Sequence, residues 1–223
     1  MPEIGVGSGQ RVAIGITGAS GALYATRTIA ALLERGVHIE LIVSDYGRRL
    51  LRDELGDAAS IDRLTAFLAG KYGPGVAAGT FTLHSNRDLG ATVASGSHGC
   101  SGMAIVPCSM RTLAAVVHGL GDNLIHRAAD VILKERRKLL LAPREAPLSD
   151  IHLENMLKLS RMGVVICPPM PGFYQRPDSI DDLVNHSVVR MLDQFDIHLD
   201  APGRWGEAFA LGMASQPEDS EEF

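Results

Sequence analysis

Short apolar runs alternate with amphipathic stretches along most of the chain. RVAIGIT (11–17) and VHIELIVS (37–44) have the composition of buried strands, and the segment between them has helical periodicity and ends at Gly36. Residues 45–56 continue as a second helix with leucines on one side. This order predicts a βαβ unit near the N-terminus.

The alternation becomes weaker in the middle of the chain and then returns. Residues 57–98 are interrupted by glycines and contain short strand candidates at TFTLHS (80–85) and ATVAS (91–95). Further strands are expected at 103–107, 138–143 and 164–167, and helices are expected after Ser109, after Asp122 or Asn123, after Ser149, and over 179–197.

Strands that alternate with helices in this way favour parallel pairing through right-handed crossovers. The sequence therefore predicts one α/β domain, a three-layer, doubly wound parallel sheet of the flavodoxin-like or Rossmann-like type. We expect the domain to span residues 11–206, between a flexible N-terminus at 1–10 and a polar acidic tail at 207–223. Ligands of such sheets bind outside the carboxyl ends of the strands.

The composition of the chain limits the classes of partner that it could bind. The 223 residues are 46% hydrophobic and carry a formal charge of −5, which argues against nucleic acid or an anionic membrane surface as the main partner. There is no apolar run of about 18 residues and no signal-peptide pattern at the start, so a cytoplasmic protein is expected.

The three cysteines, Cys100, Cys108 and Cys167, form no CxxC pair and are expected to be buried thiols. His98 and Cys100 could belong to a metal site, but no second ligand pair follows them, so we expect no metal.

The turn GITGASGA (15–22) joins the first strand to the first helix and has glycines at every third position, 15, 18 and 21, instead of the GxGxxG of a dinucleotide fold. Backbone N–H groups and a helix N-terminus favour an anion here, with Thr17 and Ser20 as hydroxyl donors. The alternative for Ser20 is a plain helix cap.

Two more strand ends carry polar groups. Asp45, after the second strand, would hold the ribose of NAD, so a dinucleotide stays possible at this point. PCSMRT, after the strand at 103–107, offers Ser109, Arg111 and Thr112, which favour a second cradle and a mononucleotide. Ser109 has a helix cap as its equal alternative.

Several basic or phenolic side chains could meet the same anion. Arg127 and Lys134 are two helical turns apart, and Arg144 and Glu145 follow a strand end. Arg190 interrupts an apolar helical run, where it could face a site or extend along the surface, and Tyr174 follows the last strand.

Together these segments resemble the UbiX-type flavin prenyltransferases. The resemblance runs through most of residues 11–206, in TGASGA (17–22), ASGS (94–97), PCSMRTLA (107–114), NLIHRAADVILKERR (123–137), PREAPLS (143–149), IHLENMLKLS (151–160) and GFYQRPDSIDDLV (172–184). It implies a homododecamer that joins a dimethylallyl group from dimethylallyl monophosphate to N5 and C6 of reduced FMN, without a metal. The product, prenylated FMN, is delivered to UbiD-type decarboxylases.

The resemblance also implies roles for individual residues. The FMN set is Gly18, Ala19, Ser20, Ser44, Ser109, Met110, Arg111, Thr112, Arg127 and Arg144. The prenyl phosphate set is Lys134, Tyr174 and Arg190, with Glu145 nearby and Trp205 closing over the site. Glu54 is implied to handle protons together with Ser20. Cations and a phenol suit this chemistry because they stabilise the departing phosphate oxygens.

Two alternatives remain beside flavin prenyltransfer. One is a cysteine-type decarboxylase of the same fold, although such enzymes carry PxMNxxMW where this chain has PCSMRTLA. The other is an FMN-binding oligomer without catalytic activity. His98 and Arg111 depart from the family pattern, and their roles are left open.

Overall fold

A computed structural model describes residues 9–199 of the chain. Six strands form one sheet in the order β3-β2-β1-β4-β5-β6, and every neighbouring pair is parallel. The strands are β1 (Arg11–Ile16), β2 (His38–Val43), β3 (Thr80–Ser85), β4 (Gly102–Cys108), β5 (Lys138–Pro143) and β6 (Val165–Ile166). The strand order reverses between β1 and β4, so the predicted doubly wound sheet is confirmed.

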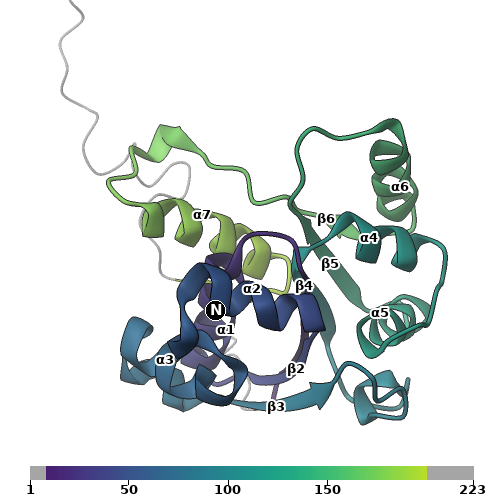
Figure 1. Cartoon of the computed structure of the whole chain (residues 1–223). Coiled ribbons are helices and arrows are strands. Elements are labelled where there is room, and N and C mark those ends of the chain that lie inside the picture. The colour runs from purple at the N-terminus through teal and green to yellow at the C-terminus, as the bar shows by residue number, and fades with distance from the viewer. Residues whose placement is uncertain (1–8, 200–223) are drawn as a thin grey trace, which may run out of the picture.

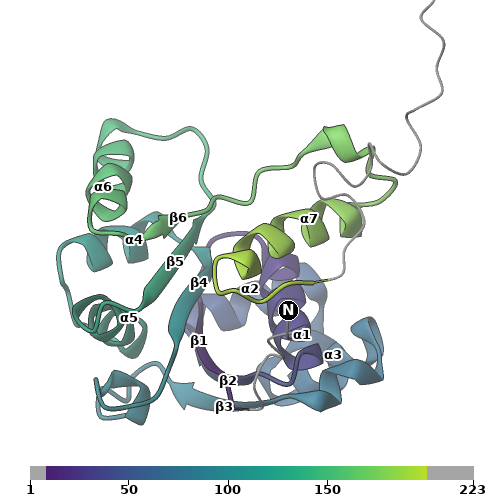
Figure 2. The ribbon, with the colours of Figure 1, turned by 180° about the vertical axis from the view of Figure 1, so that it is seen from behind.

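Helices cover both faces of this sheet (Figures 1 and 2). They are α1 (Ala22–Glu34), α2 (Asp45–Leu55), α3 (Leu64–Tyr72), α4 (Met110–Val117), α5 (Leu124–Lys134), α6 (Asp150–Arg161) and α7 (Ile180–Asp193). One core cluster joins the sheet to α1, α2, α3 and α7, and a second joins it to α4, α5 and α6. The protein therefore has three layers with a core on each side of the sheet.

The central strands are buried because both of their faces are covered, whereas the edge strand β3 is largely exposed. In β1 and β4 nearly all residues are buried, which explains why these segments are continuously apolar and do not alternate. The exception in the sheet is Glu40 of β2, an acidic residue that is only 2% exposed.

Two predictions for the middle of the chain were wrong in detail. Helix α3 was not predicted, because its nine residues include Gly70 and follow a run of turns that hides the helical period. Residues 91–95 form no strand: Thr92–Ala94 is a 3₁₀ turn that buries Val93 in the core cluster with α5.

Among the exposed large apolar side chains, two groups lie on neighbouring positions. The segment 168–179 between β6 and α7 extends away from the sheet in both views and exposes Met170 and Phe173 (Figures 1 and 2). Helix α6 exposes Ile151, Leu153 and Leu157. No helix within residues 9–199 is long and apolar enough to cross a bilayer.

Candidate functional site

The turn after β1 is attached to the end of β4. The hydroxyl of Thr17, which is buried, donates to Pro107 O at 2.8 Å and accepts from the N–H of Ser109 at 2.8 Å. The N–H of Thr17 donates to the same Pro107 carbonyl at 3.3 Å. This contact holds two strand ends side by side at the point where the strand order reverses, which is the position where ligands bind in doubly wound sheets.

The turn itself presents backbone donors. The N–H groups of Gly18, Ala19 and Ser20 make no hydrogen bond within residues 9–199. Glycine is required at position 18, because a Cβ there would lie 2.5 Å from the Cβ of Tyr46. Three successive amides without an internal partner fit the phosphate or carbonyl oxygens of a ligand such as FMN.

The N-terminus of α1 is occupied by Glu54 from α2. Its carboxylate accepts from the N–H of Gly21 at 3.1 and 3.2 Å and from the N–H of Ala22 at 2.8 Å. The N-cap residue is Gly21 and the Ser20 side chain makes no capping hydrogen bond, so the alternative of Ser20 as a helix cap is wrong. A carboxylate at this position interacts favourably with the helix dipole, and it lies next to the exposed Ser20.

The hydroxyls at the next strand ends cap helices. Ser109 accepts from the N–H of Thr112 at the start of α4, and Ser44 accepts from the N–H of Gly47 at the start of α2. The cap predicted for Ser109 is confirmed, and a flavin contact remains a prediction. Arg144, just after β5, donates from Nε to the carbonyl of Ser20 at 3.1 Å. The ends of β1, β4 and β5 therefore meet at one place.

The remaining residues of the predicted FMN set lie around this edge. Met110 is buried in the first turn of α4, and Arg111 beside it is exposed. Burial lowers the pKa of His126 on α5, and the nearby charge of Arg111 lowers it further while Asp122 opposes the shift. Arg127 lies close to the loop that joins α4 to α5, since a Cβ at Gly121 would be 3.1 Å from its Cδ.

Two acidic residues near the same edge have partners within the chain. Asp45, the position suited to a dinucleotide ribose, forms an ion pair with Arg87 at 3.0 Å. Glu145 accepts from the N–H of Ala146 at 3.1 Å and is exposed next to Arg144.

Lys134 does not lie at this edge. It ends α5, four residues before β5 begins, and a Cβ at Gly96 would be 2.9 Å from its Nζ. Its Nζ pairs with Glu135 Oε1 at 2.6 Å. The start of β5 and the loop that contains Gly96 both lie at the amino ends of the strands. Lys134 is therefore at the opposite end of the strands from Ser20, which follows the carboxyl end of β1.

Tyr174 and Arg190 come from the last part of the described chain. Tyr174 lies on the extended segment before α7, where its hydroxyl is 2.9 Å from His186 Nε2. Arg190 is exposed in the last turn of α7, near enough to Cys167 to oppose the rise in the pKa of that thiol that burial causes. Trp205 lies outside the described residues. Of the residues predicted for the prenyl phosphate, Lys134 is the one whose place in the fold separates it from the FMN set within one chain.

The thiols are largely buried, as predicted. Cys100 and Cys108 are buried and Cys167 is half-buried, and burial raises the pKa of all three. Within residues 9–199 no group of three or more His, Cys, Asp or Glu side chains could hold a metal ion.

Sequence reasoning missed Tyr46. This residue is 71% exposed at the start of α2, directly against Gly18, and so it borders the turn that carries the free amides. Its position three residues after the end of β2, at the edge where ligands bind, is the signal that could have identified it.

The sequence of the chain matches those of known flavin-binding proteins. The Flavoprotein family model matches residues 6–191. The flavin prenyltransferase LpdB of Lactiplantibacillus plantarum is 46% identical over 197 residues, which cover 88% of this chain and 98% of that protein.

Two solved structures resemble the whole domain. One is a dodecameric FMN-dependent UbiX-like decarboxylase from Escherichia coli O157:H7, with a TM-score of 0.76 and 44% identity over 88% of this chain and 99% of that one. The other is AnUbiX in complex with FMN and dimethylallyl pyrophosphate, with a TM-score of 0.76 and 41% identity over 87% of this chain and 98% of that one.

Proposed function

This chain belongs to the UbiX-like flavin prenyltransferases of the Flavoprotein family, and we propose that it joins a dimethylallyl group from dimethylallyl monophosphate to N5 and C6 of reduced FMN. The observation that carries the proposal is the row of free amides at Gly18, Ala19 and Ser20, beside Ser109 and Arg144. The FMN and dimethylallyl pyrophosphate held by AnUbiX, which is 41% identical, support it.

The chain would bind FMN along the ends of β1, β4 and β5. The amides of residues 18–20 would donate to ligand oxygens, and Arg144 would add a positive charge. The hydroxyls of Ser44 and Thr112 would add donors, and Ser109 Oγ, which donates to Thr112 Oγ1 at 3.1 Å, orients the Thr112 hydroxyl. Reduced FMN, when bound, supplies the electron-rich ring that accepts the prenyl group. Tyr46 and the buried Thr17 keep the turn in place from either side.

Glu54 is placed to accept a proton. Its carboxylate is fixed by the amides of Gly21 and Ala22, and Ser20 is the adjacent residue. Ser20 and Glu54 would together take up the proton that the flavin releases when the second bond forms, with the carboxylate of Glu54 as the acceptor.

The leaving phosphate needs positive charge and a hydrogen-bond donor, which Lys134, Arg190 and Tyr174 would provide. Because Lys134 lies at the opposite end of the strands from the turn after β1, we propose that a neighbouring copy contributes it to the site. The dodecameric relative from Escherichia coli supports such an assembly, and the exposed apolar residues of α6 and of 168–179 are suited to burial in it. A UbiD-type decarboxylase as recipient of the product and a cytoplasmic location belong to the same proposal.

A single assay tests this function. The protein is incubated anaerobically with reduced FMN and dimethylallyl monophosphate, and the flavin is analysed by mass spectrometry, with the pyrophosphate as a parallel donor. We expect the flavin mass to increase by one dimethylallyl unit with the monophosphate. An unchanged flavin mass, while FMN is demonstrably bound, contradicts the proposal, and a gain with the pyrophosphate alone contradicts the choice of donor.

A further inference from the structure

Glu40 is a buried carboxylate that the proposed reaction does not use. It lies on β2, and it is the only acidic side chain buried among residues 9–199. An unpaired carboxylate in this position would be strongly unfavourable, so its partners determine what it does.

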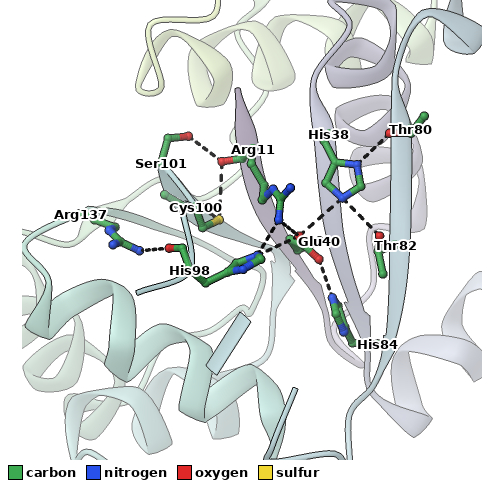
Figure 3. A network of polar contacts seen from close by, with 11 residues as sticks. Arg11, His38, Glu40, Thr80, Thr82, His84, His98, Cys100, Ser101 and Arg137 are labelled. Carbon is green, nitrogen blue, oxygen red and sulfur yellow. Dashed lines mark hydrogen bonds and ion pairs between the residues drawn. The ribbon is translucent and has the colours of Figure 1, made fainter. Parts of the chain in front are cut away.

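Four side chains from separate parts of the fold converge on it (Figure 3). His84 of β3 binds one carboxylate oxygen, and His98 binds the other at 2.9 Å. Arg11 of β1 is 3.0 Å away, and His38 of β2 is 3.5 Å away. Burial by itself raises the pKa of Glu40, but the contacts with His84 and His98 outweigh this and lower it, so the carboxylate is charged.

His98 is the only one of these partners that lies outside the sheet. It belongs to the loop 95–101, whose carbonyls at Gly96 and His98 each accept a 2.7 Å hydrogen bond from Arg137. At its end, Ser101 donates to the carbonyl of Arg11 at 2.7 Å. Figure 3 shows the side chain of His98 pointing at Glu40. The loop is therefore fixed by one side-chain anchor and two sets of backbone contacts.

The fixed loop touches Lys134. A Cβ on Gly96 would lie 2.9 Å from Lys134 Nζ and would also collide with the Glu135 carboxylate that pairs with it. The backbone at Gly96 thus limits the position of the ammonium group on one side. The exposed fraction of the Lys134 side chain is 55%, so packing against other residues does little to fix its position.

We propose that Glu40 and His98 are positioning residues for Lys134. The buried carboxylate holds His98, His98 holds the loop 95–101, and the loop fixes the ammonium group in the place from which it meets the phosphate of the prenyl donor. This inference rests on the proposed function, which assigns that phosphate to Lys134. It adds to that assignment a set of residues near the amino ends of the strands, none of which touches a reactant.

The test uses two histidines that share one carboxylate. His98→Leu removes the anchor of the loop, whereas His84→Gln changes the other side of Glu40 and leaves the loop contacts intact. We expect His98→Leu to raise KM for dimethylallyl monophosphate roughly 10-fold with FMN affinity unchanged, and His84→Gln to change KM less than about 2-fold. His98→Gln, which restores a donor at a similar reach, should recover most of the loss. Equal effects of His98→Leu and His84→Gln on KM would overturn the proposal.

Gly96→Ala tests the contact between the loop and Lys134 directly. The added methyl group displaces the ends of two long side chains, so the protein should fold normally while KM for the donor rises by about 10-fold. Hydrogen exchange of the 95–101 amides provides a readout without activity: it should become faster in His98→Leu and stay unchanged in His84→Gln. Unchanged exchange in His98→Leu contradicts the anchor.

The design separates the two levels of the argument. If Lys134→Ala leaves KM for the donor unchanged, the role of Lys134 in the proposed function is wrong. If Lys134→Ala raises KM but His98→Leu and Gly96→Ala do not, the proposed function stands and the positioning inference fails.

Discussion

The two edges of the sheet use their polar groups in opposite ways. At the carboxyl edge three successive amides, at Gly18, Ala19 and Ser20, have no partner within the described residues. Toward the amino edge Glu40 has partners from three strands and a loop. Three successive backbone donors without partners can receive the oxygens of a ligand, whereas a network whose members are all paired holds elements in place. Under the two proposals above, the carboxyl edge binds the flavin and the amino edge positions Lys134.

Among variants that test this difference between the two edges, Glu40→Gln is expected to have the largest effect. It leaves Arg11 and the histidines without a buried counter-charge and should lower the free energy of unfolding by about 3 kcal/mol at pH 7, as measured by urea denaturation. The pKa of Glu40 lies below its ordinary value of 4.5, so its stabilisation is complete above that pH and is lost as the pH falls through the folded-state value. Wild type should therefore lose stability toward acid more steeply than the variant. Parallel pH profiles would contradict the pairing.

Lys134→Ala tests whether the amino edge serves the chemistry. Removing a charged partner of the phosphate should raise KM for dimethylallyl monophosphate by about 100-fold, with FMN affinity unchanged. Arg190→Ala should behave in the same way. The measurement is steady-state kinetics together with FMN titration, and loss of FMN binding would show that these residues serve the flavin instead.

Thr17→Val separates the two strand ends at the carboxyl edge. The substitution leaves the N–H of Ser109 without its acceptor and should lower the free energy of unfolding by about 2 kcal/mol. It should also weaken FMN binding, because the turn loses its fixed position. Weakened folding with normal FMN affinity would mean that this contact serves the fold alone.

The smallest effect comes from two helix caps compared with each other. Ser109→Ala and Ser149→Ala each remove a cap and should each lower the free energy of unfolding by about 1 kcal/mol. Only Ser109 stands at the proposed site, so only its loss should weaken FMN binding in a fluorescence titration. If Ser109→Ala and Ser149→Ala had equal affinities for FMN, Ser109 would serve only as a helix cap.

Much of the carboxyl edge could be predicted from the sequence because its signals are local. A buried apolar run followed by Gly18 and a helix is contiguous in the chain, and Ser109 follows its own strand in the same way. Helix α3 was missed because its short sequence, interrupted by Gly70, carries little periodicity. The role of Ser20 as a cap was wrong because a carboxylate from α2, 33 residues away from Gly21, took that place.

The amino edge could not be predicted because its contacts are long-range. Glu40 stands out as the only acidic residue in VHIELIVS, but its partners His84 and His98 are 44 and 58 residues away. No spacing rule connects three histidines on two strands and a loop. The position of Lys134 likewise follows from the direction in which α5 runs past the sheet, and the family resemblance gave its role but not its place.

The separation of Ser20 from Lys134 has a consequence for how much product a cell can make. A strand of six residues spans about 20 Å, so the two side chains of one chain cannot serve the same reaction. Under the proposed assembly, diluted chains would still bind flavin but would stop transferring prenyl groups. The specific activity, which is the rate per chain, would then rise with enzyme concentration. A cell with more of this protein would gain both more chains and a higher rate from each chain.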